Sequence, residues 1–201
     1  MLFMVRTRIL LLNPEFTEAR FKGAPMPLLY AAAPLLDRNR EVRIADFSLP
    51  KGFIPSFEFK PHIVGITSTS PSHLAACRLA SIIKELEPRT LVVKGGIHET
   101  YCAETTRLKH PDIDISIRGE GESAFREIVE KFEGGETLFP PIITGNSVAD
   151  LDKLPFALRN LLADSPFYNF GIFKGRKTAQ IMTVRGCPFT CTFCSSDVSV
   201  R

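Results

Sequence analysis

The sequence lacks a hydrophobic run long enough to cross a membrane. No stretch approaches the ~20 consecutive apolar residues that a bilayer-spanning helix needs. The apolar start over residues 1–5 is interrupted by Arg6 and Arg8, and no small-residue cleavage site follows it. These absences predict a protein without a membrane span, and we expect a cytoplasmic location.

The sequence also lacks a strong excess of charge of one sign. Its 25 Lys and Arg are balanced by 22 Asp and Glu, which leaves a formal net charge of +3. No basic run is long enough to form a nucleic-acid face, so we expect no nucleic-acid partner. With 44% hydrophobic residues among 201, the composition is that of a globular chain able to bury a core.

Two nucleotide-binding signatures are missing as well. The chain contains no G-x-G-x-x-G, the fingerprint of dinucleotide-binding folds, and no G-x-x-x-x-G-K-[ST], the phosphate loop of many NTPases. These absences argue against a nicotinamide cofactor and against a triphosphate bound in a phosphate loop.

What the sequence does contain is an alternation of apolar runs and helical patterns. Strand patterns cover residues 8–13, 41–47, 62–67, 91–93 and 113–117, and helical patterns cover 25–36, 72–87, 98–108 and 123–132. Pro34 should kink or end the first helix. The alternation predicts an α/β fold, a doubly wound parallel sheet with helices on both faces. We expect the flavodoxin-like strand order 2-1-3-4-5.

Residues 136–180 break this alternation with repeated prolines and glycines and predict a linker, with a short helix near 156–162. A last strand is expected at 179–184, leading directly into the cysteine-rich end of the chain. The predicted division is an α/β domain over 1–145, a linker over 146–178 and the start of a second domain over 179–201.

Small or polar residues follow each predicted strand. In an open parallel sheet, ligands bind outside the carboxyl ends of the strands. Hydroxyls and free N–H groups there can hold phosphate, sugar or amide groups, and glycines let a flat group approach the backbone. The residues are Asn13, Asp46, Thr67, Ser68, Thr69, Ser70, Gly95, Gly96, Gly119, Glu120, Gly121 and Glu122, with His98 after the glycine pair. The same residues suit ordinary β/α turns and caps, so the pattern indicates a ligand crevice without identifying the ligand.

Five cysteines are present, an odd number, and Cys187, Cys191 and Cys194 form one tight cluster. Cys77 and Cys102 stand alone and are expected to be small buried groups in helices. In a reducing cytosol, clustered cysteines favour a metal over a disulfide. Three thiolates on one loop suit a four-iron cluster with one iron open to a small molecule. Zinc completed by a distant ligand, or a Cys191–Cys194 redox disulfide, are the alternatives.

The segment from Thr183 to Cys194 reads TVRGCPFTCTFC. It resembles the signature of radical S-adenosylmethionine enzymes, C-x3-C-x2-C with an aromatic residue before the third cysteine. The resemblance implies a [4Fe-4S] cluster on Cys187, Cys191 and Cys194 whose open iron chelates S-adenosylmethionine. Reductive cleavage then produces a 5′-deoxyadenosyl radical, and Phe193 is implied to lie beside the adenine.

The upstream domain resembles the cobalamin-binding domain of one large subgroup of these enzymes. The resemblance rests on NP after the first strand, GITST at the third, KGGIH at the fourth, RGEGE at the fifth and the connector LDKLP. It implies cobalamin contacts from Asn13, Thr67, Ser68, Thr69, Ser70, Gly95, Gly96, His98, Gly119 and Glu120.

One departure concerns the lower ligand of cobalt. Cobalamin proteins that supply a histidine ligand carry D-x-H-x-x-G after the first strand, whereas residues 13–18 here read NPEFTE. We therefore expect base-off cobalamin without a protein histidine on cobalt.

The resemblance as a whole implies the N-terminal part of a cobalamin-dependent radical S-adenosylmethionine enzyme. Methyl transfer to an unactivated carbon of a small-molecule substrate is the expected reaction, with an electron donor such as flavodoxin or ferredoxin. A cyclase or oxidoreductase of the same architecture, and a non-catalytic cobalamin- or nucleotide-binding module, are the alternatives.

Two other families fit less well. Methylthiotransferases carry an upstream cysteine where this chain has Asn13-Pro14, and response-regulator receivers need an acidic pair that the first strand lacks. Members of the resembled family continue into a full (β/α) barrel after the cysteines, whereas this sequence stops at Arg201. We therefore expect the 201-residue chain to be an incomplete enzyme, not competent by itself.

Overall fold

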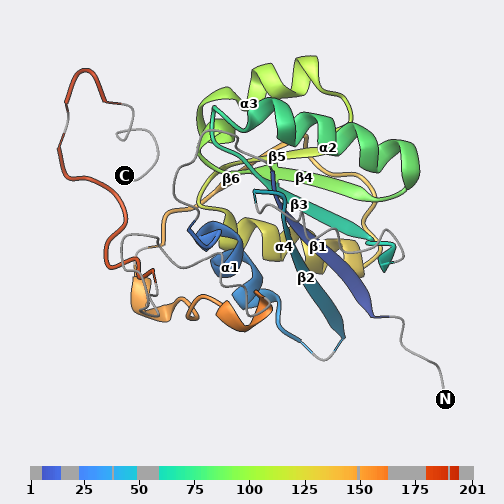
Figure 1. Cartoon of the computed structure of the whole chain (residues 1–201), viewed down its shortest axis with the longest axis horizontal. Coiled ribbons are helices and arrows are strands. Elements are labelled where there is room, and N and C mark those ends of the chain that lie inside the picture. The colour runs from blue at the N-terminus through green and yellow to red at the C-terminus, as the bar shows by residue number, and fades with distance from the viewer. Residues whose placement is uncertain are drawn as a thin grey trace.

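The computed structural model describes residues 6–14, 23–37, 39–48, 59–148, 150–162, 180–189 and 191–194. A parallel sheet forms the centre of the molecule, with the order β2-β1-β3-β4-β5-β6 (Figure 1). Its strands are β1 (Thr7–Asn13), β2 (Arg40–Asp46), β3 (Ile63–Thr67), β4 (Leu91–Gly95), β5 (Ile115–Gly119) and β6 (Ile142–Gly145). The α/β fold and the expected order of the first five strands are confirmed.

Helices cover both faces of the sheet (Figure 1). They are α1 (Met26–Ala32), α2 (His73–Leu86), α3 (Ile97–Lys109) and α4 (Gly121–Glu133). Figure 1 shows α2 and α3 together on one side, and α1 with α4 on the other. The first helix ends where expected, because a 3-10 turn, η1 (Ala33–Leu35), replaces α-helix around Pro34.

The core follows the two-residue period of the strands. Ile9 and Leu11 of β1 face the layer of α1 and α4, whereas Leu10 and Leu12 face α2. Because helices bury both faces of the sheet, side chains on both sides of the strand are apolar. The strand therefore reads as a continuous apolar run. This is the pattern from which the strand was predicted.

The sixth strand was not expected from the sequence. β6 lies in the segment whose prolines predict a linker, and it pairs with β5 at the edge of the sheet. Its four residues are all partly exposed or exposed, so it carries a weak apolar signal. Regular structure thus continues past residue 136, where the prolines and glycines predicted that the alternation breaks off, and the domain boundary after residue 145 stays a prediction.

Three further expectations differ in detail. β5 begins at Ile115 rather than at Ile113, and the expected helix near 156–162 is a single 3-10 turn, η4 (Arg159–Leu161). Residues 180–184, expected to form a last strand, form no strand in the structure. Residues 163–179 lie outside the described residues, and a barrel beginning at 179 stays a prediction.

The connector predicted from LDKLP contains a 3-10 turn, η3 (Leu151–Lys153), capped by the side chain of Asp150. Within the parts of the chain that the structure describes, no helix has both the length and the apolar character needed to cross a membrane.

Candidate functional site

A cavity of about 430 Å³ lies at the carboxyl ends of β3, β4 and β5. Its floor is apolar and includes Leu11, Val93, Ile117 and Phe125. Helix α1 and the N-terminal ends of α3 and α4 form its walls. This is the edge at which open parallel sheets bind ligands, so the cavity occupies the position expected for the crevice.

Of the ten residues that the resemblance implies as cobalamin contacts, five line this cavity: Thr67, Gly95, Gly96, Gly119 and Glu120. Each comes from a strand end or from the first residues of the following loop. They are up to 53 positions apart in the sequence, from Thr67 to Glu120, and the parallel sheet brings them to one edge.

The other predicted contacts lie outside the cavity wall. Asn13, at the end of β1, donates from its side-chain amide to Asp46 Oδ1 at 2.8 Å. Thr69 and Ser70 are exposed in the loop after β3. Residues 15–18, where a histidine ligand would be expected, lie outside the described residues.

Gly96 is required by the way the loops after β3 and β4 interlock. Its φ is +100°, and an added Cβ would lie 2.6 Å from the carbonyl oxygen of Ser68 and 2.9 Å from its nitrogen. Only glycine adopts this backbone conformation readily. The two loops therefore approach each other closely at the rim of the cavity.

Ser68 carries a polar group that the described protein leaves without a partner. Its backbone N–H donates to Gly95 O at 2.9 Å, and its carbonyl accepts from His98 N at 3.2 Å. Its side chain is buried, with the residue 2% exposed, yet Oγ has no hydrogen-bond partner among the described residues. A buried hydroxyl without a partner is uncommon in folded proteins, and Ser68 is not among the residues that line the cavity.

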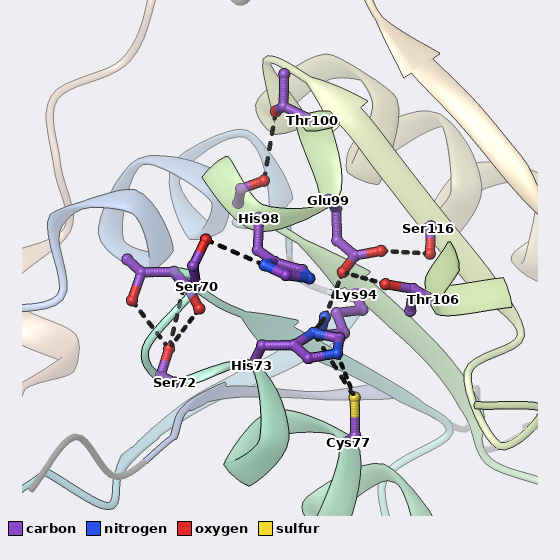
Figure 2. A network of polar contacts seen from close by, with 12 residues as sticks. Ser70, Ser72, His73, Cys77, Lys94, His98, Glu99, Thr100, Thr106 and Ser116 are labelled. Carbon is purple, nitrogen blue, oxygen red and sulfur yellow. Dashed lines mark hydrogen bonds and ion pairs between the residues drawn. The ribbon is translucent and has the colours of Figure 1, made fainter. Parts of the chain in front are cut away.

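A buried polar network supports these loops from the α2–α3 side of the sheet (Figure 2). Lys94 of β4 forms an ion pair with Glu99 of α3, and both side chains are fully buried. The Glu99 carboxylate also accepts from Thr106 Oγ1 at 3.0 Å and from Ser116 Oγ at 2.7 Å. The network joins β4, β5 and α3 directly behind Gly95, so it holds the start of α3 in place.

Two histidines extend the network to the loop after β3 (Figure 2). The ring of His73 stacks on that of His98 with centroids 3.9 Å apart, and Lys94 Nζ lies 2.9 Å from His73 Nδ1. His98 Nδ1 lies 3.2 Å from Ser70 Oγ. Burial, helped by the nearby Lys94 charge, lowers the pKa of His73 to about 4, so this ring is neutral at pH 7. His98 is half-buried, and its contacts with His73 and Ser70 join α3 to the loop after β3.

His73, Cys77 and His110 bring potential metal ligands within 4.8 Å of one another. Nitrogen and sulfur donors of this kind suit zinc. The ammonium group of Lys94 beside His73 repels a second cation, however, and burial raises the pKa of the Cys77 thiol. We interpret this group as part of the packed network. Cys77 is buried as expected, whereas Cys102 is only half-buried.

The three clustered cysteines lie on an exposed turn. Cys187, Cys191 and Cys194 all have exposed side chains, and Cys194 N donates to Cys191 O at 3.0 Å. Phe193, between the last two, is 91% exposed. The turn therefore presents the three thiols and the aromatic ring on one accessible segment.

The residues just before the cysteines contact the cavity. Met182, Val184, Arg185 and Gly186 all line it. Arg185 Nη2 lies 2.7 Å from Glu122 Oε1, and Nη1 lies 3.7 Å from Glu120 Oε1. The cysteine turn therefore begins at the edge of the cavity, a proximity that the sequence did not predict.

Comparison with known proteins adds a family and several relatives. Residues 16–129 match the B12 binding domain family. An uncharacterised methyltransferase of Pyrococcus horikoshii is 33% identical over 95% of this chain and 46% of its own length. The anaerobic magnesium-protoporphyrin IX monomethyl ester cyclase of Synechocystis sp. is 26% identical over 93% of this chain and 42% of its own length.

A solved structure supports the fold. The radical S-adenosylmethionine methyltransferase TsrM from Kitasatospora setae, with cobalamin and a [4Fe-4S] cluster bound, superposes with a TM-score of 0.54 at 21% identity. The match covers 66% of this chain and 25% of that one. Our chain thus spans less than half the length of these relatives.

Proposed function

Because the chain belongs to the B12 binding domain family, we propose that it is the cobalamin-binding part of a cobalamin-dependent radical S-adenosylmethionine enzyme. One observation carries the proposal. The segment leading into Cys187 lines the same cavity as the strand ends expected to contact cobalamin. The two motifs recognised separately in the sequence thus meet at one site.

The residues around the cavity suit a large, flat ligand with amide groups. Gly95, Gly96 and Gly119 line the cavity, where the absence of side chains exposes the backbone to a ligand. A cavity of about 430 Å³ suits a drug-sized group. Cobalamin is larger, so one part of it would enter the cavity while the remainder covers the strand ends.

The absence of a histidine from the cavity wall supports base-off binding. Among the described residues, the lining includes no histidine, and His98 is held by His73 and Ser70 instead. We therefore propose that this chain supplies no imidazole to cobalt. The apolar floor and the small rim would bind the cofactor by shape and by hydrogen bonds.

The cysteine turn is the proposed site of the iron–sulfur cluster. Cys187, Cys191 and Cys194 would hold three irons of a [4Fe-4S] cluster, and Phe193 would cover the adenine of S-adenosylmethionine. Such a cluster supplies reductive cleavage of S-adenosylmethionine. What this chain contributes is the thiolates, their accessibility and their location beside the cavity.

Methyl transfer to an unactivated carbon is the reaction we propose for the whole protein. The methyltransferase relative at 33% identity favours it, and the cyclase relative supports ring formation as the second candidate. A small-molecule substrate and a flavodoxin- or ferredoxin-type electron donor complete the proposal.

Cobalamin binding tests the first half of this proposal. Hydroxocobalamin added to the chain should bind with a changed absorption spectrum. After reduction to cob(II)alamin, the EPR spectrum should lack nitrogen superhyperfine splitting. No binding would refute the cobalamin site, and nitrogen splitting would refute the base-off, histidine-free state.

Anaerobic reconstitution with iron and sulfide tests the second half. The chain should acquire a [4Fe-4S] spectrum that changes when S-adenosylmethionine is added. Cys187→Ala should lose the cluster, and Cys77→Ala, a change at a buried helical cysteine, should keep it. Sub-stoichiometric iron without a response to S-adenosylmethionine would favour a non-catalytic binding module instead.

A further inference from the structure

We propose that Arg185 is a positioning residue that anchors the cysteine turn to the wall of the cavity. The role of the cysteine turn rests on the proposed function, whereas the contacts of Arg185 are given by the structure alone. Arg185 precedes Cys187 by two residues, yet its side chain contacts groups 63 and 65 positions earlier in the sequence, Glu122 and Glu120.

The guanidinium group of Arg185 is held on three sides. Its Nη2 lies 2.7 Å from Glu122 Oε1, its Nη1 lies 3.7 Å from Glu120 Oε1, and its Cζ lies 5.1 Å from the centre of the Tyr30 ring. A planar guanidinium can engage two carboxylates and an aromatic face at once. The far oxygen of Glu120 accepts from Val148 N at 2.8 Å, which orients that carboxylate.

This contact is more shielded than an ordinary surface ion pair. The side chain of Arg185 is only 14% exposed, and those of Glu120 and Glu122 are 11% exposed. By contrast, Arg126 and Glu130 of α4 form a pair whose side chains are 54% and 44% exposed. Exposed pairs contribute little, whereas removing the cation from shielded carboxylates leaves their charge uncompensated.

The anchor acts directly on the position of the cysteines. Gly186, with φ of +84°, turns the chain immediately after Arg185 and before Cys187. Arg185, Glu120, Glu122 and Gly186 also line the cavity. The same side chains therefore form part of the cavity wall and hold the residues just before the cysteine turn. The anchor sets how far the thiols lie from the cavity.

A distance measurement between two spin labels tests this anchor without any cofactor. One nitroxide is placed on Cys187 and the other on a cysteine replacing the exposed Leu108 of α3, in a chain with Cys102, Cys191 and Cys194 changed to alanine. We expect a narrow distance distribution with arginine at position 185. Arg185→Gln should broaden it and lose the main peak, while circular dichroism shows that the α/β fold is retained.

Two controls and one second variant make the test specific. Arg126→Gln, the same change in the exposed pair on α4, should leave the distribution narrow. Arg185→Lys keeps the charge but not the planar group, so it should restore the main peak only in part, and Glu122→Ala should broaden the distribution from the other side of the pair. An unchanged distribution in Arg185→Gln, or equal broadening in Arg126→Gln, would overturn the proposal. Because no cobalamin or cluster is present, failure to bind either cofactor would contradict only the proposed function.

Discussion

Replacing Lys94 by methionine removes the cation from a carboxylate that is shielded from water. The side chains of Lys94 and Glu99 are both 0% exposed and form an ion pair. Glu99 keeps two neutral donors, the hydroxyls of Thr106 at 3.0 Å and Ser116 at 2.7 Å. Methionine fills the space of the lysine stem without charge, so the main change is a buried carboxylate left without its counter-ion.

We expect the free energy of unfolding at pH 7 to fall by about 3–5 kcal/mol in Lys94→Met, the range for a buried pair broken from one side. The double variant Lys94→Met with Glu99→Gln should lose less, about 1–2 kcal/mol. Its neutral amide can still accept from a hydroxyl, and no charge is stranded. Removing both charges should therefore be milder than removing one.

Urea unfolding followed by circular dichroism measures these differences. The parent, the two single variants and the double variant form a double-mutant cycle that isolates the coupling between residues 94 and 99. Arg126→Gln serves as the control, because its exposed pair should change stability by about 1 kcal/mol or less.

Two results would contradict this reasoning. A loss in Lys94→Met no larger than in the Arg126→Gln control would mean that the buried pair contributes no more than a surface pair. A double variant as unstable as Lys94→Met would mean that the uncompensated charge is not the cause of the loss.

Three further predictions concern the loops and the surface. Gly96→Ala should lower the free energy of unfolding by about 1–3 kcal/mol in a urea titration, because alanine is strained at φ +100°. It should also weaken cobalamin binding; an unchanged affinity would mean that this loop does not contact the cofactor. Ser68→Ala should raise stability by about 1 kcal/mol, because it removes a buried hydroxyl without a partner. Urea unfolding measures the change, and a loss of stability would mean that the hydroxyl is already satisfied. The hydrogen bond from Arg40 lowers the pKa of Glu133, so this pair stabilises the fold above the ordinary carboxyl value of 4.5 and loses its effect as pH falls through the lowered value. Stability curves of Arg40→Gln and the parent should therefore differ by about 1 kcal/mol or less at pH 7 and converge in acid; a constant gap would exclude this linkage.

The strands of the sheet were predictable from their apolar runs, whereas the strand order was an expectation taken from the flavodoxin-like winding. Residues 9–12 form an uninterrupted apolar run, which is typical of a strand covered by helices on both faces. β6 lacked that signal, since its four residues lie at an exposed edge. Its place depends on pairing with β5, a long-range contact that local sequence does not encode.

The candidate site likewise contains parts that the sequence predicted and parts that only the structure shows. The spacing of Cys187, Cys191 and Cys194 predicts its chemistry locally, because three ligands on one loop need no distant partner. Lys94 reads as an ordinary charged residue after a strand, yet it is fully buried against Glu99. The sequence also did not predict that His73 and His98, 25 positions apart, stack on each other.

The sequence by itself determined the alternation of strands and helices, the glycines and hydroxyls at the strand ends, and the cysteine turn. Each depends on neighbouring residues, through side-chain periodicity, backbone freedom or ligand spacing. Only the tertiary structure decided that Arg185 meets Glu120, Glu122 and Tyr30, and that the cysteine turn therefore starts at the cavity. Such contacts join residues far apart in the chain, and they form only once the packed sheet has brought its carboxyl ends to one edge.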